Sequence, residues 1–235
     1  MITRQAILVA GGTGLVGREV IKYLLASGHC AIALVRRGGR GALETLGAGD
    51  ALRILEVDFD ALGRAQPEVS ALAPTGLVCA LGTTIRKAGT QAAFAKVDRD
   101  YVAAFAALGR AAGAHHFALV SSVGADARSS AFYLRTKGEA EAAVGACGYR
   151  RVDIARPSFI LGRRTETRSG ERLGFTLTNF IAPLLLGPLK AYRPIPASII
   201  ARALVNLGAR DEPGVFIHHF GELVAAGAMA QKLST

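Results

Sequence analysis

The sequence predicts an α/β fold in which helices cover both faces of a doubly wound parallel sheet. Apolar runs of strand length alternate with longer amphipathic stretches up to about residue 155, which is the pattern of successive βαβ units. These runs are apolar almost throughout, as expected of strands buried on both faces. With 235 residues, of which 51% are hydrophobic, the chain can form one substantial core and is too short for two large domains.

Six strands are predicted, at residues 6–10, 31–35, 53–57, 76–81, 117–121 and 151–155. Between the fourth and fifth strands, five apolar side chains recur at steps of three and four residues: Phe94, Val97, Tyr101, Phe105 and Leu108. This spacing places them on one face of a helix, while Arg99, Asp100 and Arg110 lie away from that face.

A further helix is predicted before the sixth strand. It can start after Ser130 as the N-cap and end near Gly148, which suits the left-handed position beyond a helix C-terminus. The pattern changes after Arg156-Pro157, where an apolar region is interrupted by Pro183, Pro188, Pro194 and Pro196. Residues 199–207 then regain helical spacing.

The formal net charge of +10 favours an anionic partner. The basic residues are nevertheless scattered in isolated pairs, without a basic helix or an aromatic RNA-binding motif, so nucleic acid is not expected as a partner. The apolar runs are too short to span a bilayer and the N-terminus lacks the pattern of a secretory signal. We therefore expect a cytoplasmic protein without a membrane span.

The cysteines and histidines do not predict a disulfide framework or a metal site. Cys30, Cys79 and Cys147 lie far apart in apolar surroundings and are expected to be reduced core residues. The adjacent pairs His115-His116 and His218-His219 would point to opposite faces of a strand. They therefore lack chelating geometry and are expected to be packing or surface residues.

A glycine-rich turn follows the first predicted strand directly. It consists of Gly11, Gly12, Thr13, Gly14, Leu15, Val16 and Gly17. Gly12 permits a tight turn, Gly14 removes the side chain where a pyrophosphate approaches the backbone, and Gly17 lets the helix pack close to the sheet. The free N–H groups at the helix N-terminus would then hold phosphate groups. The turn predicts a dinucleotide-binding domain of the Rossmann type.

The end of the second strand indicates which dinucleotide is bound. NAD-binding domains place a carboxylate here to bind the ribose 2′-hydroxyl, whereas this strand ends in Arg36 and Arg37. Arginine favours the 2′-phosphate of NADP(H); a solvated strand end is the alternative. Asp58 and Phe59 could contact the adenine, and Gly82-Thr83-Thr84 could border the nicotinamide ribose. Either segment could instead be an ordinary turn.

A serine, a tyrosine and a lysine form a candidate catalytic set. Ser121 and Ser122 end the fifth strand, and the next helix carries Tyr133 and Lys137. The spacing of four residues places the tyrosine and the lysine on one helix face. A nearby ammonium group and an oxidised nicotinamide would stabilise the tyrosine phenolate, which makes the phenol a usable acid–base group. A buried aromatic ring beside a surface lysine is the alternative.

Together these motifs resemble those of the short-chain dehydrogenase/reductase superfamily over essentially the whole chain. The resemblance implies a seven-stranded Rossmann-like sheet. It also implies that Ser122 binds the substrate oxygen, that Tyr133 transfers its proton, that Lys137 orients the nicotinamide ribose, and that Pro157 borders the cofactor. Asp98 stands where many members have an asparagine that supports a proton relay.

Four segments are similar to the Tat-interacting-protein branch of atypical members: residues 81–84, 87–89, 97–101 and 116–126. That branch binds NADPH and is oxidoreductase-like, and its eukaryotic representative is associated with transcriptional and nuclear-transport regulation. The resemblance therefore implies the cofactor and leaves the reaction open.

Our leading hypothesis is an NADP-dependent oxidoreductase that transfers hydride between the nicotinamide and a carbonyl or alcohol carbon. One alternative is a non-catalytic NADP(H)-responsive binding protein, in which the dinucleotide stabilises a partner-binding surface. A further alternative is a sugar-nucleotide epimerase or dehydratase, although the residues after the sixth strand are few for a nucleotide-sugar domain.

The two parts of the chain have different expected roles. Residues 1–155 form the expected cofactor-binding core, and residues 156–235 form a small substrate-side segment of the same domain. Residues 175–189 are expected to form a mobile apolar lid over a pocket for a partly apolar small molecule; a core helix or an oligomer contact is the alternative. A homo-oligomer or a protein partner remains open.

Overall fold

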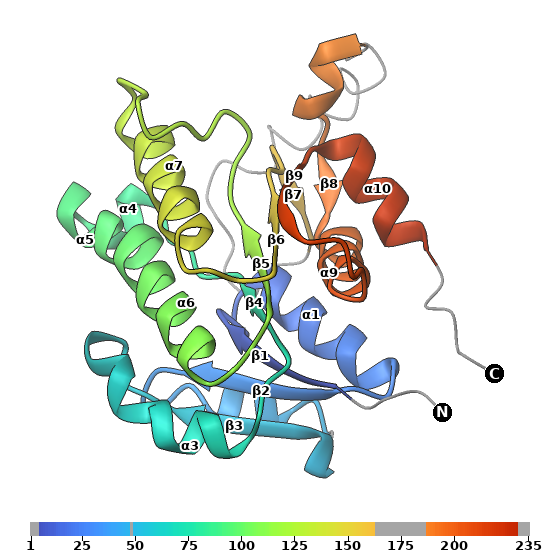
Figure 1. Ribbon diagram of the computed structural model, residues 1–235. Coiled ribbons are helices and arrows are strands. Elements are labelled where there is room, and N and C mark those ends of the chain that lie inside the picture. Colours follow the sequence, from blue (N-terminus) through green and yellow to red (C-terminus); the bar gives the residue numbers. More distant parts are fainter. Residues whose placement is uncertain (1–4, 48, 163–186, 230–235) are drawn as a thin grey trace.

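A seven-stranded parallel sheet organises the molecule (Figure 1). The computed structural model describes residues 5–47, 49–162 and 187–229. The strand order is β3-β2-β1-β4-β5-β6-β9, and every neighbouring pair is parallel. The seven strands are β1 (Ala6–Ala10), β2 (Cys30–Val35), β3 (Leu52–Glu56), β4 (Gly76–Cys79), β5 (His116–Val120), β6 (Arg151–Ala155) and β9 (Gly214–His218). The doubly wound parallel sheet expected from the sequence is confirmed.

Helices cover both faces of this sheet (Figure 1). One face carries α3 (Gln66–Ala71), α6 (Tyr101–Ala111) and α7 (Phe132–Gly145), and the other carries α1 (Leu15–Ala26), α9 (Ala197–Leu207) and α10 (Phe220–Ala228). The shorter helices are α2 (Gly41–Glu44), α4 (Ile85–Ala88) and α5 (Gln91–Ala95). A separate two-stranded sheet joins β7 (Ile160–Leu161) to β8 (Ile195–Pro196).

Two apolar cores lie between the sheet and its helices. Successive side chains of a strand point to opposite faces, so Leu8 of β1 belongs to the core under α6 and α7, while Val9 belongs to the core under α1 and α9. In α1, Val16, Val20 and Leu24 follow one another at steps of four residues and are all buried. The near-continuous apolar strands of the sequence therefore reflect burial on both faces.

The order of the strands reverses beside β1, which makes a topological switch point. The chain winds from β1 outward to β2 and β3, then returns to place β4 on the other side of β1. Ligands of such sheets bind outside the carboxyl ends of the strands at this switch point. The turn after β1 and the segment after β4 both lie there.

The helix predicted from the apolar residues between Phe94 and Leu108 is not a regular α-helix throughout. Between α5 and α6 the backbone forms a π-helical turn at Lys96–Asp100, an insertion that shifts the register of the helix. Because of this shift, Asp98 is buried, whereas Val97 is only partly so. The predicted helix exists, but the regular spacing assumed for it was wrong at this turn.

Several predicted boundaries also need correction. The N-cap of α7 is Ala131, and not Ser130, because the backbone of Ala131 is still extended where the helix begins at Phe132. β4 ends at Cys79 and β5 at Val120, so Leu81 and Ser121 follow their strands. His115 likewise precedes β5, and His219 is the N-cap of α10. Of the predicted lid at 175–189, residues 175–186 lie outside the described residues; a short 3₁₀ helix spans Gly187–Tyr192.

Candidate functional site

The glycines of the turn after β1 lie where side chains cannot be accommodated. Gly11 has a φ of +82°, and a Cβ atom there would overlap the carbonyl of Ala80. A Cβ atom on Gly17 would overlap the carbonyl of Gly11, and the Gly14 N–H donates to that same carbonyl at 2.9 Å. The turn is therefore tight, and helix α1 begins directly against the backbone that precedes it.

The N-terminus of α1 has the properties of a phosphate-binding site. Its N-cap is Gly14, so no side chain caps the first N–H groups, and the first turn contains no acidic residue. Thr13 and Gly14 are exposed, while Gly12 and Val16 are buried below them. Uncapped N–H groups at the positive end of a helix attract anions. The local structure therefore fits the pyrophosphate of a dinucleotide.

The carboxyl ends of β2 and β3 form the second part of the site. Arg36 and Arg37 are exposed there, and the Arg36 guanidinium lies 6.0 Å from the centroid of the Tyr101 ring. Phe59 is buried, with its ring centroid 5.5 Å from that of Tyr101. Asp58 caps the 3₁₀ helix at Phe59–Ala65 by accepting from the Asp60 N–H at 2.9 Å. Arg36 and the Asp58-Phe59 segment thus converge on Tyr101.

The segment after β4 is held by Asp98. The Thr83 N–H donates to Asp98 Oδ2 at 2.8 Å, and a Cβ atom on Gly82 would lie 3.5 Å from Asp98 Oδ1. Thr84 caps α4 by accepting from the Lys87 N–H at 3.1 Å. The π-helical turn therefore fixes the loop that the sequence predicts to border the nicotinamide ribose.

Lys137 forms a buried ion pair with the same aspartate. Lys137 Nζ lies 2.7 Å from Asp98 Oδ1, and the side chains are 8% and 1% exposed. A buried charge needs a partner of opposite sign, and the π-helical turn supplies one. The sequence places Lys137 on a helix face. Its pairing with Asp98, which joins α7 to the turn before α6, was not predicted.

Tyr133 lies one helical turn before Lys137 and is open to solvent. Its side chain is 39% exposed, and its ring centroid lies 5.6 Å from that of Phe94. Ser122 is partly buried, and its hydroxyl donates to the Val123 carbonyl at 3.3 Å. Tyr133 is thus exposed in the first turn of α7, and Ser122 lies partly exposed just after β5.

The neighbouring Ser121 is part of a buried hydrogen-bonded network. The Ser121 hydroxyl donates to Glu141 on α7, and Glu141 also accepts from Arg156 Nε at 3.0 Å. This network joins the ends of β5 and β6 to α7, and the Val123 N–H donates to the Pro157 carbonyl at 3.0 Å. Sequence reasoning did not identify Glu141. Its spacing of four residues from Lys137 was the available signal, since both then share a helix face.

A polar cluster that the sequence did not reveal lies inside the sheet. Asp153 of β6 accepts from His116 at 2.9 Å, from His218 at 2.8 Å and from Arg151 at 2.7 and 2.8 Å. Burial opposes its ionisation, but the bonds from His116, His218 and Arg151 outweigh burial and hold the pKa of Asp153 well below its usual range. His116 and His218 are thus paired with a buried carboxylate rather than simply packed.

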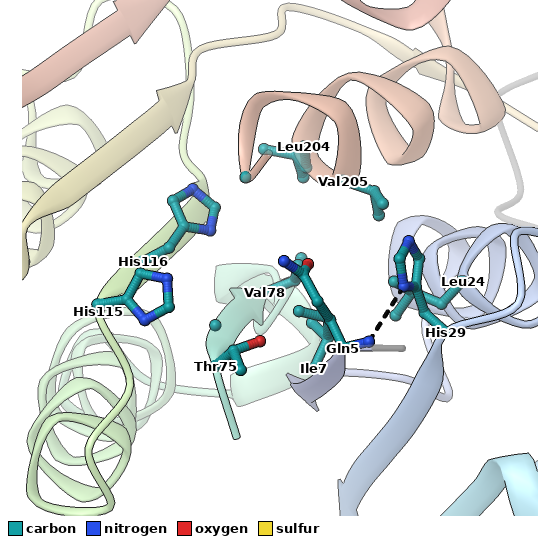
Figure 2. Close-up of a pocket in the computed structure, with 12 residues that line it drawn as sticks. Gln5, Ile7, Leu24, His29, Thr75, Val78, His115, His116, Leu204 and Val205 are labelled. Carbon is teal, nitrogen blue, oxygen red and sulfur yellow. Dashed lines mark hydrogen bonds between the residues drawn. The ribbon is translucent and has the colours of Figure 1, made fainter. Parts of the chain in front are cut away.

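A small cavity lies at the amino-terminal ends of β1, β4 and β5 (Figure 2). It has a volume of about 20 Å³, enough for a single water molecule. Gln5, His29, Thr75 and His115 are among its lining residues, and the Gln5 N–H donates to His29 Nδ1 at 3.4 Å. Burial lowers the pKa of His29. The cavity is too small for a substrate.

Neither a membrane-spanning helix nor a metal-binding cluster is present in the part of the chain that the structure describes. In 5–47, 49–162 and 187–229, no helix is long and apolar enough to cross a membrane. Within the same ranges, no group of three or more histidine, cysteine, aspartate or glutamate side chains is arranged to hold a metal ion.

Comparison with solved structures finds the same fold in longer enzymes. The enzyme WbmG of Bordetella bronchiseptica, solved with NAD, has a TM-score of 0.68 at 17% identity, over 93% of this chain and 73% of that one. A UDP-glucose 4-epimerase of Thermotoga maritima, solved with UDP-glucose, has a TM-score of 0.68 at 16% identity, over 92% and 77%. At this identity the likeness concerns the fold alone.

Comparison of sequences identifies the family. The NAD(P)H-binding family model matches residues 11–165. The protein HTATIP2 of Rattus norvegicus is 36% identical over 86% of this chain and 80% of its own length. The mitochondrial protein fmp52 of Aspergillus clavatus is 34% identical over 88% of each chain. The chain therefore belongs to the NAD(P)H-binding family, as an atypical member of the short-chain dehydrogenase/reductase superfamily related to HTATIP2 and fmp52.

Proposed function

We propose that this protein is an NADP-dependent oxidoreductase that acts on a carbonyl or alcohol carbon of a small, partly apolar molecule. The observation that carries the proposal is the position of Lys137 and Asp98 beside the loop after β4, with Tyr133 one helical turn before Lys137. This loop and the uncapped N-terminus of α1 both lie at the switch point of the sheet. A dinucleotide lying across that point would have its phosphates on α1 and its nicotinamide beside Lys137.

The bound cofactor supplies the hydride chemistry, and the protein supplies binding and proton transfer. Tyr133, which is 39% exposed, gives a proton to the substrate oxygen during reduction and removes it during oxidation. Ser122 holds that oxygen by a hydrogen bond. Lys137 donates to the ribose hydroxyls and stabilises negative charge on the phenol.

Asp98 gives this site a different charge balance from one with asparagine at the same position. Because the Asp98 carboxylate pairs with Lys137 at 2.7 Å, the ammonium charge is partly neutralised before any ligand binds. The same carboxylate holds the Thr83 N–H. We assign Asp98 a positioning role, in which it fixes Lys137 and the loop after β4 relative to each other.

Arg36 is the basis for the proposed preference for NADP. We expect NADPH to bind at least about tenfold more tightly than NADH, because a charge-assisted phosphate contact is lost with NADH. Arg36→Asp should reduce or reverse this preference, and Arg128→Asp, at a side chain that is 91% exposed, serves as the control. Calorimetric titration with both cofactors measures the effect. Equal affinities in the unmodified protein would contradict the assignment.

A turnover screen tests the reaction itself. Purified protein is supplied with NADPH or NADP and a panel of aldehydes, ketones and alcohols, and the absorbance of the reduced nicotinamide is followed. Native mass spectrometry of the purified protein reports any retained ligand. Turnover with exchangeable NADP supports the proposal. Tightly retained NAD together with epimerisation of a sugar nucleotide would contradict it, as would NADP binding without turnover on any substrate class.

A further inference from the structure

Lys96 lies near the same aromatic ring as Arg36 at the adenosine end of the site. Lys96, at the start of the π-helical turn, has its Nζ atom 5.8 Å from the centroid of the Tyr101 ring, and the Arg36 guanidinium lies 6.0 Å from the same centroid. Lys96 is 60 positions beyond Arg36 in the sequence. Only the fold brings the two cations to one aromatic ring.

Asp60 holds Lys96 in this position. Lys96 Nζ lies 2.7 Å from Asp60 Oδ1, and the Tyr101 hydroxyl donates to the same oxygen at 2.9 Å. The hydrogen bonds from Lys96 and Tyr101 hold the pKa of Asp60 below its usual range, and the bond to Asp60 raises the pKa of Lys96. Both groups are therefore charged at neutral pH.

The ion pair between Lys96 and Asp60 is open to solvent, with side chains 50% and 55% exposed. Exposed pairs contribute little to the stability of the fold, so stability does not explain the position of Lys96. Its ammonium group can also change partner at small cost. A phosphate group, with more charge than a carboxylate and three acceptor oxygens, is a stronger partner for it.

The charges at this end of the site are mixed, so the added positive charge of Lys96 matters for binding a phosphate group. Arg36, Arg37 and Lys96 are cations, whereas Glu56, Asp58 and Asp60 are carboxylates; the Gly38 N–H donates to Glu56 at 3.2 Å. A phosphate monoester carries about −1.5 to −2 near neutral pH. Without Lys96 the carboxylates would outnumber the two arginines, and this end of the site would attract the phosphate less.

We infer that Lys96 is a determinant of cofactor specificity that acts together with Arg36 on the 2′-phosphate of NADP, with Asp60 and Tyr101 positioning its ammonium group. This inference rests on the proposed NADP preference and adds to it a residue from a different part of the chain. It assigns a role in binding to the π-helical turn, whose middle residue Asp98 pairs with Lys137. The turn would thus contact one end of the cofactor through Lys96 and position Lys137 at the other.

The test compares the affinities of Lys96 variants for NADP and NAD by calorimetry on the full chain. Lys96→Gln should weaken NADP binding by about tenfold, which corresponds to the loss of one charge-assisted contact, and should leave NAD binding within about twofold. Lys96→Arg should retain most of the NADP affinity, since the charge is kept. The matched control is Lys22→Gln, because Lys22 also forms an exposed ion pair, 2.8 Å from Glu19, far from this end of the site.

The outcomes separate this inference from the proposed cofactor. Equal NADP and NAD affinities in the unmodified protein would contradict the NADP preference itself. A preference that Lys96→Gln leaves intact would contradict only the role of Lys96. Equal weakening of both cofactors by Lys96→Gln would also overturn it, because NAD has no 2′-phosphate. Unchanged NAD affinity of the variant shows at the same time that the variant is folded.

Discussion

Replacing Tyr133 with phenylalanine is expected to lower kcat by a factor of about 10²–10⁴ on a substrate found in the turnover screen. The phenol is the proton donor and acceptor of the proposed reaction, and phenylalanine lacks it. The affinity for NADP should stay within about twofold, because the tyrosine hydroxyl does not hold the pyrophosphate. The fold should also persist, since the ring that contacts Phe94 is kept and the side chain is 39% exposed.

Steady-state kinetics and calorimetry on the same preparations check this result. Tyr23→Phe is the control: it removes a tyrosine hydroxyl that donates to Asn206 at 3.1 Å, on the part of α1 distant from the site. Its kcat should be unchanged. Undiminished turnover by Tyr133→Phe would exclude the proposed proton transfer, whereas loss of both turnover and cofactor binding would indicate a structural role for the ring.

The parts of the site that follow from local sequence were predictable. The turn at 11–17 lies between a strand and a helix in the chain itself, and its geometry depends on φ angles and close approaches that glycine permits. The spacing of Tyr133 and Lys137 likewise places both on one helix face, whatever the rest of the chain does. The six predicted strands are present as well, because each is mostly apolar over the length of a strand.

The partners of these residues were not predictable, because they depend on packing between distant segments. The ion pair between Lys137 and Asp98 exists because a π-helical turn rotates Asp98 inward, and the apolar stripe gave no sign of that insertion. Lys96 and Arg36 converge for a similar reason. Sequence spacing predicts contacts within an element, whereas contacts between elements require the fold.

The contacts of His116 and His218 with a neighbouring strand were also not predicted. The sequence predicts both histidines of each pair on one strand, whereas only His116 and His218 lie in strands. Asp153 lies on the strand between them in the sheet order β5-β6-β9. The pairing becomes visible only when the neighbouring strands are aligned.

Asp153→Asn is expected to destabilise the fold by about 3–5 kcal/mol, the usual cost of breaking a buried ion pair. The carboxylate is fully buried and pairs with Arg151, which is 2% exposed. The amide keeps the shape of the side chain but leaves the Arg151 charge unneutralised. Urea unfolding measures the change in the free energy of unfolding. Asp50→Asn, at an exposed position, should change it little, and a similarly small effect at Asp153 would contradict this account.

The dependence of this effect on pH provides a second check. Because the pKa of Asp153 is lower in the folded protein than its ordinary value of 3.8, its carboxylate adds stability that is fully present above that value. This contribution is lost as the pH falls below 3.8 toward the folded pKa. The unmodified protein should therefore lose unfolding free energy more steeply than Asp153→Asn in this range, and the difference between the two should narrow. A difference that stays constant from neutral pH down into this acidic range would show that the charge of Asp153 is not what stabilises the cluster with Arg151, His116 and His218.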